Sequence, residues 1–311
     1  MTKYAYIHGD IVPIEQASIS LLNNTFHYGT GCFGGIRGYW NEEQEQLYVF
    51  RIEDHFRRFL NSAKMLLCEF DVTPADLAKV TVDLLQREGW RQNCYIRPVA
   101  YKDVDFYRVW LHDGNDDIAI VSIPVGKYLE KDEGAKVCVS SWRRVDDTAI
   151  PARGKVNGSY VNSALIKSDA MLSGYDEALT LSHDGHVSEG SAANFMMVRD
   201  GVIITPPVTD NILEGITRRT IMELARVELG LTVVERPIDR TELYIADEAF
   251  FCGTGVQVAA IASIDNRKVG ASSPGPITSR ISQLYFDVVY GRNPEYMHWL
   301  TPVPQTEAVV N

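Results

Sequence analysis

Two short turns carry the residues best suited to chemistry, a lysine and a glutamate. Lys155 stands in a glycine- and asparagine-rich segment, 153–159, just ahead of a run with the apolar periodicity of a helix. Glu189 stands in the sequence Ser-Glu-Gly-Ser, 188–191, between two strand-like segments. Because most lysines are surface charges in water, the placement of this amine on a rigid turn, with a carboxylate on a second turn, sets the pair apart.

An amine and an acid of this kind suit pyridoxal phosphate. That cofactor needs a lysine that forms a Schiff base with its aldehyde, and an acid that keeps its pyridine nitrogen protonated so that the ring can absorb electrons. The lysine must be neutral to attack, and both partial burial and a nearby protonated ring favour the neutral amine. Taken singly, Lys155 would be a solvated surface charge and Glu189 an ordinary turn residue.

The elements that must position these turns divide the chain into two parts. Residues 126–134 are polar and charged after a proline, which predicts a linker. The part before it, 1–125, predicts a small α+β domain, and the part after it, 135–311, a larger domain rich in strands. The elements expected in the small domain are a hairpin over 4–12, a strand at 47–50, a helix with an apolar stripe from Phe56 to Leu67, a helix that Thr73 caps and Gly89 ends, and strands at 94–100 and 118–123.

Composition narrows the class of protein. The 311 residues are 45% hydrophobic and 23% charged, as in ordinary globular chains, and 30 Lys+Arg against 41 Asp+Glu give a net charge of −11. That balance opposes nucleic-acid and anionic-membrane binding. Five scattered cysteines without paired spacing predict neither a disulfide framework nor a metal site. No apolar segment is long enough to span a membrane and no leader pattern opens the chain, so we expect a cytoplasmic protein.

One motif is rejected. Residues 29–34 match the letters of a dinucleotide-binding fingerprint, but no amphipathic helix follows them to cap a pyrophosphate. A nicotinamide cofactor is therefore not expected.

The chain resembles the class IV aminotransferases, which are fold type IV pyridoxal-phosphate enzymes, and it is most similar to the branched-chain amino-acid aminotransferases. The residues that carry the resemblance run from the block Tyr-Gly-Thr-Gly-Cys-Phe-Gly-Gly-Ile-Arg at 28–37, through the lysine and glutamate turns, to the Gly-Thr turn at 253–254. The resemblance implies an α/β (α+β) fold of two domains with the cofactor at their interface, and a homodimer or higher homo-oligomer.

The resemblance also assigns the cofactor site. Lys155 is the catalytic lysine, Glu189 the partner of the pyridine nitrogen, and Tyr160 a hydrogen-bond donor to the phenolate oxygen. The residues assigned to the phosphate are Arg58, Ile216, Thr217, Gly253 and Thr254. Without the resemblance, Tyr160 would be a core tyrosine, Arg58 a solvated arginine and the turn before Thr217 a helix cap.

The substrate pocket implied by the branched-chain pattern is lined by Tyr28, Phe33, Arg37, Tyr95, Arg97 and Tyr128. Its aromatic walls would hold an aliphatic side chain by burial. Tyr95 and Arg97 stand at i and i+2 on one face of a strand, where they could meet an acidic co-substrate. Each aromatic residue could instead be plain core packing.

Three departures from the family pattern stand near these residues. Gly34 replaces a glutamate, Ala192 and Ala193 replace a Gly-Glu pair, and Glu214 replaces a proline. Because Gly34 removes a side chain, we expect the difference to fall on the substrate range, through a looser Arg37 or a wider pocket.

The function that this resemblance implies is transamination of L-leucine, L-isoleucine and L-valine with 2-oxoglutarate, by a ping-pong mechanism through a Schiff base on Lys155. The partners would be small amino acids and 2-oxo acids. Alternatives on the same fold are a transaminase of D-amino acids or (R)-amines and an aminodeoxychorismate-lyase-like enzyme. A cofactor-binding scaffold without activity is a third alternative, which the intact Lys155, Glu189 and Arg58 disfavour. The preferred amino acid and the biosynthetic or catabolic direction stay open.

Overall fold

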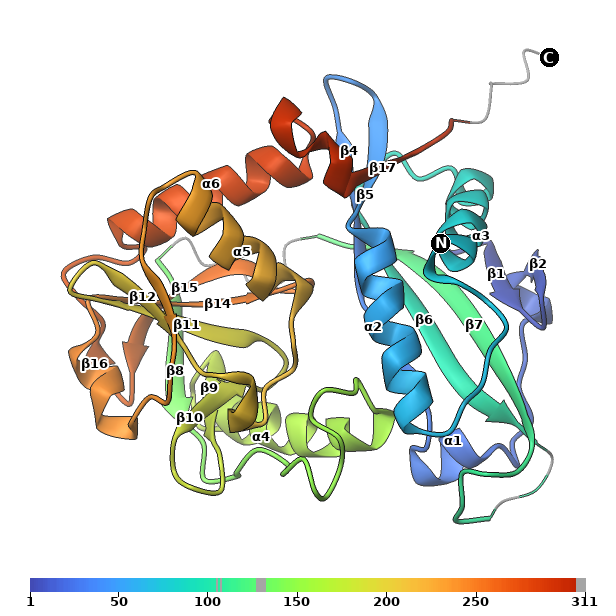
Figure 1. Ribbon diagram of the computed structural model, residues 1–311, viewed down its shortest axis with the longest axis horizontal. Coiled ribbons are helices and arrows are strands. Elements are labelled where there is room, and N and C mark those ends of the chain that lie inside the picture. The colour runs from blue at the N-terminus through green and yellow to red at the C-terminus, as the bar shows by residue number, and fades with distance from the viewer. Residues whose placement is uncertain (105, 107, 127–132, 306–311) are drawn as a thin grey trace. The chain divides into compact units, whose positions relative to one another are not determined.

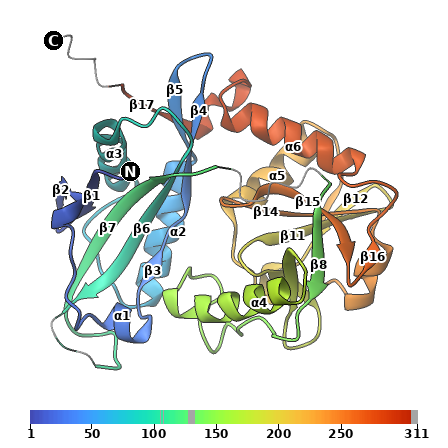
Figure 2. The ribbon, with the colours of Figure 1, turned by 180° about the vertical axis from the view of Figure 1, so that it is seen from behind.

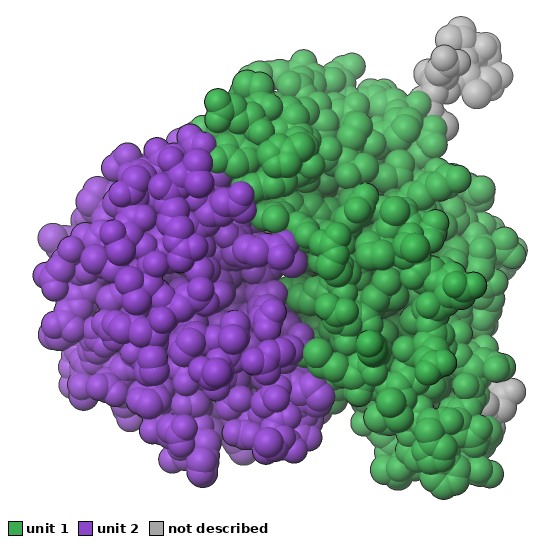
Figure 3. Space-filling view, viewed as in Figure 1, with its two compact units in different colours: residues 1–126, 154–158, 287–311 green, residues 127–153, 159–286 purple. Residues whose placement is uncertain are grey.

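The structure, a computed structural model, describes residues 1–104, 106, 108–126 and 133–305. The chain forms two compact units (Figure 3). Each unit has its own sheet. The first unit comprises residues 1–126, 154–158 and 287–311, and the second comprises 127–153 and 159–286. The expected large domain, 135–311, is thus not assigned as one block, because 154–158 and 287–311 group with the first unit. Most of the expected linker, 127–132, lies outside the described residues.

The sheet of the first unit follows the order β17-β5-β4-β6-β7-β1-β2, and β3 pairs with β6 (Figure 1). All of its pairs are antiparallel. Its strands are β1 (Tyr4–Ile7), β2 (Asp10–Pro13), β3 (Cys32–Phe33), β4 (Ile36–Asn41), β5 (Gln46–Phe50), β6 (Cys94–Asp103), β7 (Asn115–Pro124) and β17 (Leu300–Val303). The short helices are η1 (Ile14–Gln16), α1 (Asn24–Tyr28) and η5 (Pro294–Trp299). The predicted hairpin at the N-terminus is β1 and β2.

Helices α2 (Ile52–Met65) and α3 (Pro74–Glu88) pack on one face of this sheet (Figures 1 and 2). The ends of α3 are where the sequence predicts them: Thr73 and Asp76 form a reciprocal capping box, and Gly89 ends the helix in the left-handed region. The stripe expected on α2 is buried at Phe56, but the helix ends at Met65. The expectation that Leu67 continues the stripe is wrong, because Leu67 has a φ of 55° and is exposed.

The sheet of the second unit is mixed and follows the order β10-β9-β8-β15-β14-β11-β12-β13, with β16 paired to β15 (Figure 2). Its strands are β8 (Ala135–Val139), β9 (Glu177–Leu181), β10 (Val187–Gly190), β11 (Asn194–Arg199), β12 (Val202–Thr205), β13 (Val233–Glu235), β14 (Glu248–Gly253), β15 (Gln257–Ile264) and β16 (Arg267–Lys268). Its helices are η2 (Asn157–Ser159, which begins in the first unit), α4 (Tyr160–Leu172), η3 (Val208–Asp210), α5 (Ile216–Val227), η4 (Arg240–Ile245) and α6 (Pro276–Val289, which continues into the first unit). The predicted α/β fold with a strand-rich second part is confirmed.

Helix α4 buries a different face from the one its sequence suggests. The periodic run that predicts this helix is Tyr160, Val161, Ala164, Leu165 and Ser168. Helix α4 does begin at Tyr160, yet Val161 and Leu165 are exposed, at 65% and 40%. The buried face instead carries Ile166, which packs with Ala178 of β9. The spacing of the apolar residues therefore predicted that a helix forms here, but it did not predict which face of the helix is buried.

Candidate functional site

Lys155 belongs to the short segment of residues 154–158 that packs into the first unit. Its carbonyl oxygen accepts a hydrogen bond from the Phe33 amide at 3.0 Å, and its own amide donates to Ser62 Oγ at 3.2 Å. The Asn157 amide donates to the Gly31 carbonyl at 2.9 Å. These bonds fix the backbone of the lysine against β3 and α2, and its side chain is half-buried.

The close approach of this segment depends on Gly29. Its amide nitrogen closes α1, and its φ of 67° lies in the region that favours glycine. The Gly158 amide donates to the Gly29 carbonyl at 3.0 Å. A Cβ at position 29 would lie 2.8 Å from Gly158 Cα, which is shorter than van der Waals contact allows. The segment that follows Lys155 is therefore held against α1 by the close approach of two glycines, Gly29 and Gly158.

Two cationic side chains lie over the Phe33 ring. Lys155 Nζ is 5.0 Å from the ring centroid, and the guanidinium carbon of Arg97 is 4.3 Å from it. Arg97 also donates to the Tyr95 hydroxyl at 3.2 Å and lies over the Tyr95 ring at 5.1 Å. The structure thus brings Phe33, Tyr95, Arg97 and Lys155 together in a group that combines aromatic surface with positive charge.

The other predicted pocket residues have different surroundings. Arg37 is buried and donates to the Gly126 carbonyl at 2.8 Å. Tyr28, on α1, is 41% exposed. Tyr128 lies outside the described residues.

The departure at Gly34 has a physical counterpart. The Gly34 amide donates to the Pro98 carbonyl at 2.8 Å, and a Cβ on Gly34 would lie 2.5 Å from Pro98 Cγ. The space in which a side chain at position 34 would begin is filled by the Pro98 ring, and the expectation about pocket width stays a prediction. Arg37 is held rather than loosened.

Arg58 lies on α2, one turn before Ser62, and is half-buried. Ser62 Oγ donates to the Arg58 carbonyl at 2.9 Å and accepts the Lys155 amide. Sequence reasoning missed Ser62, a fully buried hydroxyl that joins the α2 backbone to the lysine turn. Its only sequence signal is a polar residue on the buried face of a predicted helix.

Glu189, in the second unit, lies on β10 (Val187–Gly190), so the expectation that it stands on a turn is wrong, and its carboxylate is buried. Its side chain is 5% exposed, and Arg144 Nη2 lies 2.7 Å from Oε1. Asn194 Nδ2 donates to Oε2 at 2.9 Å, and the Leu213 amide donates to the same oxygen at 3.2 Å. Arg144 and Asn194 were not identified from the sequence, since only the folded chain brings them to the Glu189 carboxylate.

The same asparagine connects Glu189 to the start of α5. Asn194 Nδ2 also donates to the Leu213 carbonyl at 2.9 Å, and a Cβ on Gly215 would overlap Asn194 Oδ1. Gly215 is the N-cap of α5 and provides no side-chain cap. Ile216 and Thr217, which follow it, are buried. Amides at such a helix start suit an anion.

Gly253 is the last residue of β14, the neighbour of β11 in the sheet, and Thr254 follows it. A Cβ on Gly253 would lie 3.8 Å from Ala193 Cα, and the Gly190 amide donates to the Ala193 carbonyl at 2.8 Å. The predicted carboxylate, helix start and Gly-Thr turn therefore converge around residues 193–194.

Tyr160 begins α4 and is half-buried.

The cysteines are free thiols, and four of the five are buried. Burial raises the pKa of the Cys252 thiol to about 12, an effect that Arg218 opposes and Glu189 reinforces. Cys252 therefore stays protonated beside the glutamate and is no nucleophile.

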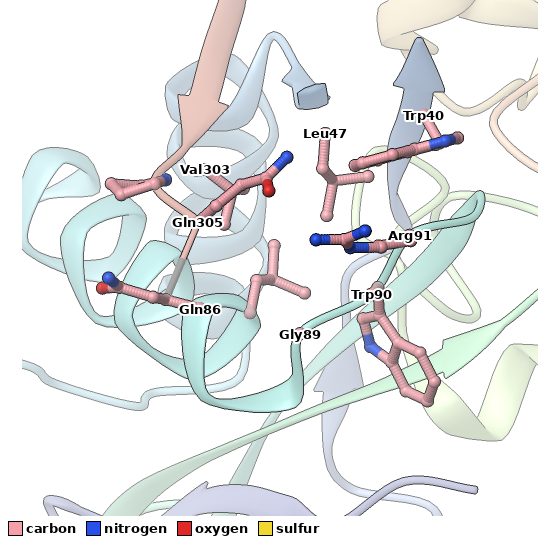
Figure 4. Close-up of a pocket in the computed structure, with 10 residues that line it drawn as sticks. Trp40, Leu47, Gln86, Gly89, Trp90, Arg91, Val303 and Gln305 are labelled. Atoms are coloured by element: carbon pink, nitrogen blue, oxygen red, sulfur yellow. The ribbon is translucent and has the colours of Figure 1, made fainter. Parts of the chain in front are cut away.

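A separate cavity of about 220 Å³ opens in the first unit between β4, β5, β17 and the end of α3 (Figure 4). Trp40, Trp90 and Arg91 contribute to its wall. None of the predicted site residues that the structure describes lines it.

Among the described residues, no helix combines the length and apolar character that crossing a membrane requires.

These groups fit pyridoxal phosphate: a half-buried amine, a buried carboxylate that can accept from a protonated ring nitrogen, and a helix start without a side-chain cap for a phosphate. Their roles are proposed below.

Residues 31–264 match the family described as Amino-transferase class IV. The chain is 46% identical over 301 residues to a probable branched-chain-amino-acid aminotransferase of Aquifex aeolicus, with 96% of both chains covered. The branched-chain amino acid aminotransferase of Thermobaculum terrenum in its PLP form has a TM-score of 0.94 at 41% identity, with 98% of this chain and 99% of that chain covered. The T.th. branched-chain amino acid aminotransferase complexed with N-(5'-phosphopyridoxyl)-L-glutamate has a TM-score of 0.91 at 37% identity, with coverages of 98% and 99%.

Proposed function

The chain belongs to the class IV aminotransferases, and from that membership we propose that it moves the amino group of L-leucine, L-isoleucine or L-valine to 2-oxoglutarate in two successive half-reactions. As a member of this family it is a pyridoxal-phosphate enzyme. When bound, pyridoxal phosphate supplies an electron-accepting ring that carries the amino group between the two substrates.

Lys155 is proposed to bind the cofactor covalently between turnovers. Once the substrate amine has displaced it, Lys155 Nζ moves the proton at the substrate α-carbon. The hydrogen bonds to Phe33 and Ser62 support this role, because they hold the lysine backbone while its side chain changes position.

The second unit supplies the remaining cofactor contacts in this proposal. Glu189 pairs with the protonated ring nitrogen, and its burial among three donors supports a carboxylate held in one orientation. The phosphate is proposed to bind Arg58, the α5 start at Ile216 and Thr217, and the turn at Gly253 and Thr254. Tyr160 is proposed to donate to the phenolate oxygen.

The observation that carries the substrate proposal is the group of Phe33, Tyr95 and Arg97 beside the lysine amine. Phe33, with Tyr28 and Tyr128, would bury an aliphatic side chain, at about 0.8 kcal/mol for each methylene removed from water. The guanidinium of Arg97 and the Tyr95 hydroxyl would bind the second carboxylate of 2-oxoglutarate.

A relative supports one site for both substrates. The T.th. enzyme is complexed in one structure with N-(5'-phosphopyridoxyl)-L-glutamate and in another with 4-methylvaleric acid. An acidic and a branched aliphatic ligand therefore bind the same relative, and we extend that behaviour to this chain.

The test measures each half-reaction alone by the absorbance of the bound cofactor. Leucine, isoleucine and valine should react faster than alanine, aspartate and D-alanine. The methyl group of alanine buries less apolar surface than the side chains of these three amino acids, and the short acidic side chain of aspartate finds no partner in an apolar wall. Arg97→Leu should slow the 2-oxoglutarate half-reaction and leave the leucine half-reaction nearly unchanged, whereas the exposed Arg87→Leu should change neither. Equal loss in both halves would make Arg97 structural. A preference for D-alanine or (R)-1-phenylethylamine over leucine, or release of pyruvate from aminodeoxychorismate, would favour the other branches of the fold.

The covalent role of Lys155 has its own test. Borohydride reduction and peptide mapping should place the cofactor on Lys155, and Lys155→Ala should abolish turnover because the nucleophile and the proton carrier are lost together. A label on another lysine would refute the assignment.

We further propose a cytoplasmic homodimer or larger homo-oligomer. The exposed apolar residues Val161, Leu165 and Leu172 on α4, and Leu21 and Phe26 before and within α1, support association between copies. Sedimentation of the purified protein as a monomer would contradict it.

A further inference from the structure

Arg144 is the cation that faces the Glu189 carboxylate, and the fold holds it at several points. Its amide donates to the Leu181 carbonyl at 2.9 Å, and its Nε donates to the Asn211 carbonyl at 3.3 Å. Its Nη2 then lies 2.7 Å from Glu189 Oε1. The side chain is 10% exposed. The bonds to the Leu181 and Asn211 carbonyls hold the arginine on two sides and fix the position of its guanidinium.

The neighbouring arginine provides a contrast. Arg143 is exposed and donates through Nη1 to the His183 carbonyl at 2.7 Å, without a contact to Glu189. Two adjacent residues of the same type therefore differ in burial and partner, and only Arg144 serves the carboxylate.

The charge of Arg144 matters because of where Glu189 lies. Asn194 and the Leu213 amide provide hydrogen bonds to Oε2, but neither carries a charge. A buried carboxylate with neutral donors alone would lose much of its solvation without a counter-charge, and removal of one member of a buried ion pair leaves the other uncompensated. Arg144 supplies that counter-charge.

We propose that Arg144 is a positioning residue that keeps Glu189 ionised and oriented toward the ring nitrogen of the cofactor. The inference deepens the proposed function and rests on the role of Glu189 given there. Arg144 acts through Glu189 and does not itself contact the cofactor in this proposal. Its removal should therefore matter only while position 189 is a carboxylate.

A double-mutant cycle tests this dependence. The variants are Arg144→Gln, Glu189→Gln and the double variant, with Arg144→Lys as conservative rescue and Arg143→Gln as matched control. The readouts are the dissociation constant of pyridoxal phosphate from the apo-protein, the absorbance spectrum of the bound cofactor, and the rate of the leucine half-reaction.

Arg144→Gln should raise the dissociation constant about tenfold, which corresponds to ~1.4 kcal/mol, and should shift the spectrum. Arg144→Lys should recover part of the loss, and Arg143→Gln should match the parent. In the Glu189→Gln background, Arg144→Gln should add little. If Arg144→Gln does not fold, Arg144→Lys is compared in the two backgrounds, where a loss only in the parent background supports the proposal.

Other outcomes separate the two levels of inference. An equal loss from the arginine change in both backgrounds, or a parental affinity and spectrum for Arg144→Gln, would overturn the role of Arg144 and leave that of Glu189 intact. Parental behaviour of Glu189→Gln itself would overturn both.

Discussion

A methyl group at position 34 should destabilise the first unit measurably. Gly34 stands at the break between β3 and β4, opposite Pro98 of the central strand β6. The Cβ of an alanine there would lie 2.5 Å from Pro98 Cγ and 3.1 Å from Pro98 Cδ. A proline ring cannot rotate away from the contact, so the backbone of β3 or β6 must shift.

The size of the effect follows from the nature of the clash. Forcing extra carbon into a packed core costs about 1–3 kcal/mol. In a domain of about 150–250 residues each kcal/mol lowers the melting temperature by about 2–4 °C, so Gly34→Ala should melt roughly 2–12 °C below the parent.

The assay is thermal unfolding of the apo-protein and of the protein at one fixed cofactor concentration, since the cofactor stabilises the native state. Gly126→Ala is the matched control, because no atom of the described residues lies within 4 Å of the point where its methyl group would stand and its φ is ordinary. That variant should stay within about 0.5 kcal/mol of the parent.

The reasoning also predicts a coupling. In a Pro98→Ala background the ring atoms are absent, and Gly34→Ala should cost clearly less than it does in the parent. A Gly34→Ala protein that melts with the parent, or that loses the same amount in both backgrounds, would refute the packing argument.

Three further changes probe separate parts of the molecule. Gly215→Ala should displace the Asn194 amide from Glu189 and so weaken cofactor binding and slow the leucine half-reaction; unchanged values would show that the amide can move aside. Thr73→Ala removes the capping box of α3 and should cost about 1 kcal/mol in urea unfolding, with kinetics as in the parent. Arg58→Ala should lose cofactor on dialysis, with a smaller effect on the rate at saturating cofactor, and full retention would make Arg58 a surface residue.

Local chemistry explains which parts of the fold could be predicted. The cap at Thr73, the turn at Gly89 and the hairpin of β1 and β2 depend on residues a few positions apart, so their signals are complete in a short stretch. The end of α2 was missed because the apolar residues continue beyond it, while the backbone turns into the left-handed region at Leu67. The exposed face of α4 was missed for a related reason: periodicity reports that a face is apolar, and packing decides which face another element covers.

The chemistry of the site was predicted to a similar limit. The cofactor prediction is confirmed by family membership and by relatives solved with the cofactor. It could be made from the sequence because the residues around Lys155 and Glu189 carry a family pattern. Arg144, Asn194 and Ser62 carry no such pattern. Each reaches its partner through tertiary packing, as when the Arg144 amide bonds to the end of β9 and brings the guanidinium to a glutamate on β10. A single sequence records neither contact.

The lysine and the glutamate are placed by different cores. Lys155 stands in sequence between two stretches of the second unit, yet residues 154–158 pack with the first, through β3, α2 and the Gly29 turn. Arg144, Asn194 and the Leu213 amide, which hold the Glu189 carboxylate, belong to the second unit. Strain in the first core, as from Gly34→Ala, acts on the strand that carries Phe33 and therefore on the amine and the proposed carboxylate site at Arg97. Strain in the second, as from Gly215→Ala, acts on the partner of the ring nitrogen. The two functions can thus be perturbed one at a time, and the covalent and electronic parts of the proposed chemistry become separable by experiment.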